Sequence, residues 1–217
     1  LLVVQNPPVI TAQPVGQAVG AGATVTFSVE ATGTALSYQW MLNGEPISGA
    51  TVSSYTRGNV QTADAGAYTV MVANLAGSAT SDPAVLTVNN PPIMAAIPDR
   101  TIHAGSTVVI STSVTHPDLD QTLLFTLEPG APAEATLDTA TGVFRWTATD
   151  GSLNTTNPVT IRVSDNGTPS LSDAKSFSIA VVARPTILSA TIAGDFITLT
   201  WNSVPGQVYR VQYKLNL

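Results

Sequence analysis

The segment DAGAYTV at residues 64–70 decides the fold, together with the short run YQW at residues 38–40. Further upstream, apolar and hydroxyl side chains alternate through TVTFSV at residues 24–29, which is the period of two expected of a half-buried β-strand. Asn43-Gly44 supplies residues that tolerate the positive φ angles of a tight hairpin. These segments predict antiparallel strands joined by short turns.

In order and spacing, these segments resemble the immunoglobulin superfamily, most closely its intermediate set. The resemblance rests on Trp40, eleven residues after Val29, and on the pattern Asp-x-Gly-x-Tyr-x-Val. It implies that Trp40 packs in the core and that Tyr68 is the corner tyrosine. Val29 and Val70 stand where the family commonly has bridging cysteines. Burying two valines, at about 1.5–3 kcal/mol each, offsets much of the roughly 2–4 kcal/mol that a disulfide typically contributes.

One residue departs from the family pattern. Arg57 lies two positions after Tyr55, where an apolar side chain is expected. Two explanations stay open: Arg57 forms an ion pair with Asp64, or this strand is shifted in register.

The composition indicates the all-β class. Hydrophobic residues make up 44% of the chain and charged residues only 10%, against roughly 25% charged in an average domain. Solubility must then come from Thr, Ser, Asn and Gln, and Thr favours strand surfaces. No segment has a helical period. We therefore predict an all-β fold of tandem immunoglobulin-like β-sandwiches.

Charge and cysteine content exclude several functional classes. The net charge is −6 and the eight Lys and Arg residues are scattered, so the basic cluster needed for nucleic-acid binding is missing. Cysteine is absent, which excludes disulfides, thiolate chemistry and Cys-ligated metals. No apolar run reaches the roughly 18 residues needed to cross a bilayer, so we expect no membrane span in this segment.

Proline-rich junctions predict the domain boundaries. Asn-Pro-Pro occurs at residues 6–8 and 90–92, and Ala-Arg-Pro at residues 183–185. Each follows a run predicted as a strand, and paired prolines cannot continue a β-ladder. The predicted divisions are 1–7 (the end of a preceding domain, with its last strand at Leu1–Val4, and a linker), 8–89 (an immunoglobulin-like domain), 90–184 (a second sandwich) and 185–217 (part of a third domain).

The second domain resembles a different set of modules. Its predicted strands are 107–114, 122–128, 142–147, 159–164 and 174–182. The segments HPDLD at 116–120, DTATGVFRW at 138–146 and VSDNG at 163–167 occur in the order seen in cadherin-like and "Putative Ig" repeats of bacterial surface proteins. This resemblance implies a Ca²⁺ site formed by Asp118, Asp120 and Asp165, with carbonyl oxygens from Asn89 and Asn90. The absence of cysteine in a domain type that often carries a disulfide suggests a bacterial source.

The chemistry of that site leaves two interpretations open. Ca²⁺ takes 6–8 oxygen ligands, and carboxylates one residue apart on a loop can converge on one cation. Alternatively, these aspartates cap turns through their own backbone amides, the commonest role of Asp in a loop. His116 stands where related repeats often place the first Asp, which removes one hard oxygen ligand.

The last segment resembles the second and third strands of a fibronectin type III domain. The resemblance rests on the segments TLTW at residues 198–201 and VYRVQY at residues 208–213. Trp201, Tyr209, Val211 and Tyr213 are expected to face a core. Roughly a third of such a domain is present.

The supply of catalytic groups is small, with no Cys, two His and two Lys, so we predict that the chain is not an enzyme. His103 and His116 are best explained as surface or turn residues. Lys175 is the only candidate inside a complete domain for an isopeptide cross-link. An exposed aromatic platform for sugars would have to use Tyr55, because all three tryptophans have predicted core positions.

We therefore predict a structural or adhesive segment of a secreted or cell-surface multidomain protein, acting as a spacer or a protein-protein interaction module. Its predicted partners are neighbouring domains of the same chain, other surface proteins or glycans. Ca²⁺ is the one cofactor the resemblance implies. Two alternatives remain: a carbohydrate-binding accessory region of a secreted hydrolase, and a self-assembling subunit of an extracellular filament.

Overall fold

The computed structural model describes residues 6–203, 208 and 210, and the regular structure in this part of the chain consists of β-strands and two 3-10 turns. This confirms the predicted all-β class. No helix within the described residues has the length and hydrophobicity that crossing a membrane requires.

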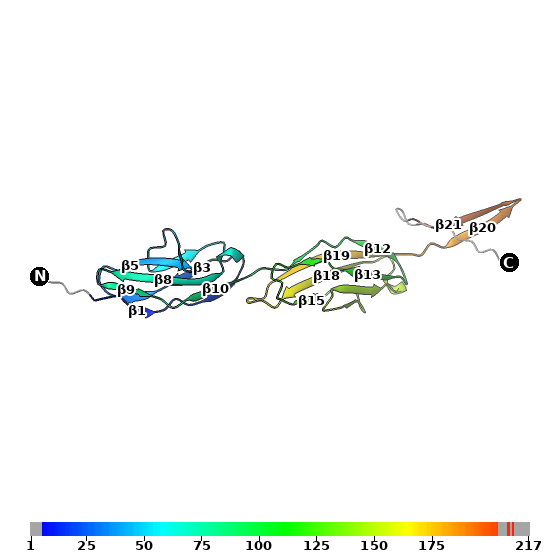
Figure 1. The fold of residues 1–217 in the computed structure, drawn as a ribbon. Coiled ribbons are helices and arrows are strands. Elements are labelled where there is room, and N and C mark those ends of the chain that lie inside the picture. The colour runs from blue at the N-terminus through cyan, green and yellow to red at the C-terminus, as the bar shows by residue number, and fades with distance from the viewer. Residues whose placement is uncertain (1–5, 204–207, 209, 211–217) are drawn as a thin grey trace. The chain divides into compact units, whose positions relative to one another are not determined.

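The first sandwich is formed by β1 to β10 (Figure 1). Its strands are β1 (Val9–Ala12), β2 (Gln17–Gly20), β3 (Val25–Ser28), β4 (Glu30–Thr32), β5 (Ser37–Leu42), β6 (Glu45–Pro46), β7 (Ser54–Arg57), β8 (Gly66–Asn74), β9 (Gly77–Thr80) and β10 (Ala84–Asn89), with the 3-10 turn η1 (Thr62–Asp64) before β8. One sheet has the order β2-β10-β8-β5-β6, and β9 also pairs with β8. The facing strands pair as β3 with β7 and β1 with β4.

Strand β10 is paired differently on its two sides. It runs antiparallel to β8 but parallel to β2, with Leu86 opposite Gln17 and Asn89 opposite Gly20. The backbone carbonyl of Asn89 also accepts a hydrogen bond from Ala21, at 2.7 Å. The end of β10 is therefore held firmly against the end of β2.

Aromatic residues from both sheets fill the core of the first sandwich. Trp40 is fully buried, and its ring centroid lies 6.2 Å from that of Phe27. Phe27 in turn stacks on Tyr68 at 4.5 Å. Val29 and Val70 are buried in the same cluster. Aliphatic side chains packed in the cluster of Trp40 thus occupy the positions where the family pattern has cysteines.

The corner tyrosine forms as predicted. The Tyr68 hydroxyl donates to the backbone carbonyl of Asp64 at 2.8 Å. Arg57 Nε lies 2.9 Å from Asp64 Oδ1, so the ion pair is the correct explanation of the unexpected arginine. Tyr55, two residues earlier, packs partly buried between Trp40 and Tyr68, with ring distances of 6.4 and 6.0 Å.

The second sandwich is formed by β11 to β19 (Figure 1). Its strands are β11 (Ile93–Met94), β12 (Arg100–His103), β13 (Thr107–Ser111), β14 (Val114–Thr115), β15 (Leu123–Leu127), β16 (Thr136–Leu137), β17 (Val143–Thr147), β18 (Thr156–Asp165) and β19 (Ser172–Val182), with the 3-10 turn η2 (Asp150–Ser152) before β18. The sheets are β12-β19-β18-β15, β13-β17-β16 and β11-β14. Four of the five predicted strands correspond to single strands, but the predicted strand 107–114 is divided into β13 and β14, which lie in different sheets. The short β11, β12 and β16 were missed.

The second core also depends on aromatic rings. Phe144 of β17 meets Phe177 of β19 edge to face, with centroids 5.8 Å apart. Trp146 is 4% exposed, and its indole N–H donates to the Ala133 carbonyl at 3.2 Å. Both tryptophans predicted for the two complete domains are therefore core residues.

The third segment is a hairpin of β20 (Ile187–Ala193) and β21 (Phe196–Trp201). Trp201 is 39% exposed, so within the described part of the chain it does not have the core position expected of it. In that part, β20 and β21 pair only with each other. Most of the predicted strand 208–213 and the predicted strand at residues 1–4 lie outside the described residues. The fibronectin type III interpretation stays a prediction.

Replacing Trp40 with alanine tests the role of the aromatic core. The indole is fully buried and its N–H donates to the Val52 carbonyl, so the substitution leaves a large cavity. We expect the free energy of unfolding of the first sandwich to fall by about 3–5 kcal/mol, measured by denaturant unfolding and circular dichroism. The same change at Trp201 is the control and should cost little. A loss at Trp40 below about 1 kcal/mol would contradict the prediction.

Candidate functional site

The predicted site residues lie at two strand ends and beside them: Asn89 ends β10, Asn90 begins the linker, Asp118 and Asp120 lie in a loop, and Asp165 ends β18. The linker follows β10, one loop joins β14 to β15, and the other joins β18 to β19. The loop segments Val114–Leu124 and Val163–Asp173 belong to the same compact unit as the first sandwich and the linker up to Met94, and the rest of the chain forms a second unit. We call the side chains of Asn89, Asn90, Asp118, Gln121 and Asp165 within the first unit the linker cluster.

Asn90 is bound to Asp118 by two hydrogen bonds. Its backbone N–H donates to Asp118 Oδ2 at 2.7 Å, and its side-chain amide donates to Oδ1 at 3.0 Å. The same amide nitrogen lies 2.9 Å from the Thr62 hydroxyl. Burial raises the pKa of the Asp118 carboxyl, but the Asn90 hydrogen bonds and the nearby His116 outweigh this effect and hold that pKa below its usual value.

Asn89 and Asp165 form the buried part of the linker cluster. Among the described residues, the buried polar and charged ones are Ser81, Asn89 and Asp165. The Asn89 amide nitrogen donates to Asp165 Oδ2 at 3.0 Å and to the Pro169 carbonyl at 2.8 Å. On its other side, Asn89 Oδ1 accepts from Gln121 Nε2 at 2.7 Å. Each buried side-chain polar atom of Asn89 thus has a partner, as burial requires.

Asp165 also closes its own loop. Its second carboxylate oxygen accepts from the backbone N–H groups of Gly167 and Leu171, at 3.1 and 2.9 Å. The Ser170 hydroxyl donates to the backbone carbonyl of Asp165 at 2.6 Å. This is the turn-capping role expected of a loop aspartate, with the linker contact added to it.

His116 supports Gln121. Its Nε2 lies 3.3 Å from Gln121 Oε1, whereas its Nδ1 is buried without a hydrogen-bond partner. Because Gln121 Oε1 can only accept, His116 Nε2 is the donor in this contact. The imidazole therefore orients the Gln121 amide toward Asn89.

The geometry tests whether calcium fits these residues. Of the five predicted ligands, Asp120 is exposed, and Asp118 and Asp165 already accept hydrogen bonds from amide nitrogens. Within the described residues, no group of three or more His, Asp or Glu side chains is placed to hold a metal ion. In this arrangement the residues do not fit a cation without rotation of Asn89. The calcium site stays a prediction.

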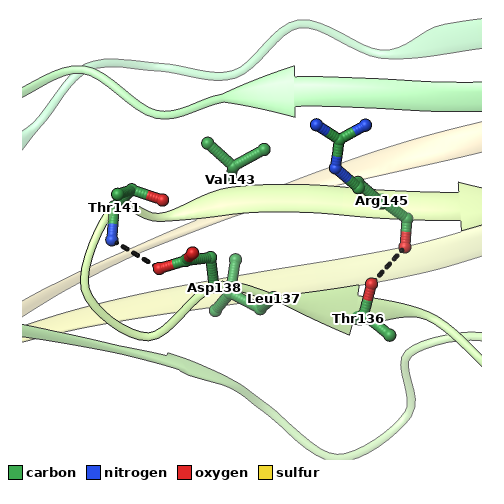
Figure 2. Close-up of a pocket in the computed structure, with 6 residues that line it drawn as sticks. All are labelled: Thr136, Leu137, Asp138, Thr141, Val143 and Arg145. Carbon is green, nitrogen blue, oxygen red and sulfur yellow. Dashed lines mark hydrogen bonds between the residues drawn. The ribbon is translucent and has the colours of Figure 1, made fainter.

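An open hollow of about 360 Å³ lies over β16 and β17 (Figure 2). Its lining residues are Thr136, Leu137, Asp138, Thr141, Val143 and Arg145. Hydrogen bonds from the backbone amides of Thr141 and Ala140 hold the pKa of the Asp138 carboxyl below its usual value. Asp138 therefore caps its own turn.

A second hollow, of about 310 Å³, lies beside Trp146. Trp146 is only 4% exposed, so the ring does not present a face on which a sugar could stack. Tyr55, the remaining aromatic candidate of the sequence, packs against Trp40. The described residues thus offer no aromatic platform at either place.

Substituting Gly167 tests the close packing of the linker cluster. A Cβ at this position would lie 2.3 Å from Asn89 Nδ2. Gly167 is not among the glycines with positive φ, so the close contact, and not the backbone conformation, disfavours alanine here. We expect Gly167→Ala to lower the free energy of unfolding of the second sandwich by about 1–3 kcal/mol. In the control, Gly151→Ala, the nearest atom is 3.6 Å away, and little change is expected. Equal effects of the two substitutions would refute the prediction.

The hydrogen bonds from Asn90 to the Asp118 carboxylate should persist to a pH below the ordinary pKa of aspartate. Because the pKa of Asp118 is lowered in the folded protein, its contribution to stability is complete above an aspartate's ordinary pKa of about 3.9 and is lost as the pH falls through the lower folded pKa. Replacing Asn90 with alanine removes one of the two hydrogen bonds and should move the titration midpoint upward. Carbon-detected NMR titration of the Asp118 carboxyl measures both midpoints, and an unchanged midpoint would argue against the contact.

Comparison with known proteins agrees with the fold of the two sandwiches. Residues 7–74 match the family model described as Immunoglobulin domain, and residues 91–182 match the one described as Putative Ig domain. No curated protein sequence matches the chain significantly.

Among solved structures, an I-band fragment of titin aligns with a TM-score of 0.58 at 19% identity, over 86% of this chain and 69% of that one. A mutated variant of the three-domain titin fragment has a TM-score of 0.58 at 20% identity, over 84% and 68%. The insect immune protein hemolin has a TM-score of 0.50 at 17% identity, over 82% and 47%. At these identities the likeness shows the fold. Sequence matches and structure together show that this chain carries immunoglobulin-like domains in tandem.

Proposed function

We propose that this tandem is a non-catalytic structural segment of a secreted or cell-surface protein, acting as a spacer or a protein-protein interaction module. The observation that carries the proposal is the succession along the chain of two sandwiches with filled cores, with the start of the linker after β10 held in the hydrogen-bonded linker cluster. Its partners would be the neighbouring domains of the same chain and other surface proteins. Folds of this kind serve many functions, so the contacts of particular residues must support the role.

The contacts of the two histidines and the partial burial of Lys175 support a non-catalytic role. His103 Nδ1 lies 2.8 Å from the carbonyl oxygen of Ala183, and His116 lies against the side-chain amide of Gln121. A carbonyl and an amide orient a histidine in a structural position, whereas a catalytic base needs a nucleophile within reach. Lys175 is half-buried, which does not favour the dry surroundings of an isopeptide cross-link.

The strand pairing supports a spacer that carries load. In the first sandwich β2 and β10 run parallel, and in the second β12 and β19 run parallel. In each sandwich, one strand of the parallel pair lies near the start of the domain and the other at its end. Tension on the two ends therefore shears several backbone hydrogen bonds at once. This arrangement favours mechanical resistance under extension.

Single-molecule force spectroscopy of the full chain tests the load-bearing role. Two variants are made, Ala18→Pro and Val19→Pro. Alternate residues of a parallel strand donate to its neighbour, so in one of the two variants proline removes a backbone N–H that β2 donates to β10. We expect that variant to unfold its first sandwich at a clearly lower force. Val15→Pro is the control, because Val15 is 75% exposed and precedes β2. Equal unfolding forces for all variants would overturn the load-bearing role.

The alternatives make different predictions in solution. A self-assembling filament subunit would show concentration-dependent mass in sedimentation velocity, and a carbohydrate-binding region would retain glycans on an array. A spacer segment should remain a monomer and bind no glycan.

A further inference from the structure

Asn89 is a polar residue at a position where the strand pattern predicts exposure. Along β10, Ala84 and Leu86 face the core and Val85 and Thr87 face out, so Asn89 belongs to the outward face. It is nevertheless only 3% exposed. The loop after β18 lies over it, with Leu171 3.2 Å from the Cβ position of Gly20, the residue opposite Asn89.

Hydrogen bonds fix the orientation of the Asn89 amide. Its nitrogen faces two acceptors, Asp165 Oδ2 and the Pro169 carbonyl, and its oxygen faces the donor Nε2 of Gln121. A flipped amide would place oxygen against oxygen and nitrogen against nitrogen. The amide therefore forms these three hydrogen bonds in one of its two orientations only.

The two loops of the linker cluster are also joined directly. The backbone N–H of Thr122 donates to Asn166 Oδ1 at 2.9 Å, which links the loop before β15 to the loop after β18. With Asn90 held by Asp118 on the first loop and Asn89 held by Asp165 on the second, both linker residues are anchored.

We propose that the amides of Asn89 and Asn90 cross-link the linker and the two loops without a metal ion. The Asn89 NH₂ group lies between a carboxylate and a carbonyl oxygen, and the partial positive charge on its hydrogens supplies the electrostatic stabilisation that a cation would otherwise supply. Residues 89 and 90 then fold together with the second sandwich, and the backbone amides of both loops need these residues for full protection from hydrogen exchange. The cross-link does not depend on the load-bearing role proposed above.

Hydrogen exchange on the full chain tests the cross-link. Asn89→Asp keeps the size of the side chain but replaces the donating nitrogen with an oxygen that faces Asp165. In this variant the amides of Gly167, Leu171 and Asn90 should exchange roughly tenfold to a hundredfold faster, as expected when a buried hydrogen-bonded group loses its partner. The amide of Val70, in the first core, should exchange as before.

The control carries the same chemical change at another asparagine. Asn59 is exposed, and its side-chain oxygen accepts from Gln61 Nε2, a role that aspartate can keep. Asn59→Asp should therefore leave all four amides unchanged. Unaltered protection in Asn89→Asp would overturn the proposal.

Calcium provides the second arm of the test. Wild-type exchange rates should be the same in EDTA and in millimolar calcium chloride. If EDTA accelerates exchange at Gly167 and Leu171, a cation holds the loops and the proposal is wrong. If Asn89→Asp does not fold, Gln121→Ala replaces it. This variant removes the side-chain hydrogen bonds of Gln121 to Asn89 Oδ1 and to His116 Nε2 but leaves the Asn89 amide nitrogen with both of its acceptors, and it should accelerate exchange at the same amides by a smaller factor. Unchanged rates in Gln121→Ala would also count against the cross-link.

Discussion

The burial of Trp40 between two sheets is the interaction on which the first sandwich depends. Immunoglobulin-like domains often fasten their sheets with a disulfide that packs on this tryptophan, and this chain has no cysteine. The ring contacts of Phe27 with Trp40 and Tyr68, together with Val29 and Val70, replace the covalent bond. Such a core keeps its stability in reducing and oxidising surroundings alike, because none of its contacts can be reduced.

The scarcity of charge gives the few charged residues defined places. Asp64 receives both the Arg57 ion pair and the backbone N–H of Gln61, Asp138 caps the turn before β17, and Asp165 closes the loop after β18. Each carboxylate fixes a turn through local hydrogen bonds that regular strand pairing cannot supply. These turns are therefore specified by single aspartates, and the strands by alternating apolar residues.

The sequence allows the strands and the first core to be predicted, because the signals that define them are local. The alternation in residues 24–29 and the pattern around Tyr68 predict β3, β8 and the tyrosine corner. The Arg57 ion pair could be named as an alternative because Asp64 lies only seven residues away. Two-residue strands such as β16 were missed because so short a segment has no period.

The linker cluster could be predicted in part, and the missing part shows why. The acidic loop residues and both asparagines are visible in the sequence, but Asn89 and its partner Asp165 are separated by 76 positions. No signal in the sequence near Asn89 indicates that its amide nitrogen, and not its oxygen, faces the Asp165 carboxylate. That orientation follows from the acceptors on one side, Asp165 Oδ2 and the Pro169 carbonyl, and from the Gln121 donor on the other. All three partners are far from Asn89 in the sequence, so only the folded chain decides that Asn89 donates to a carboxylate.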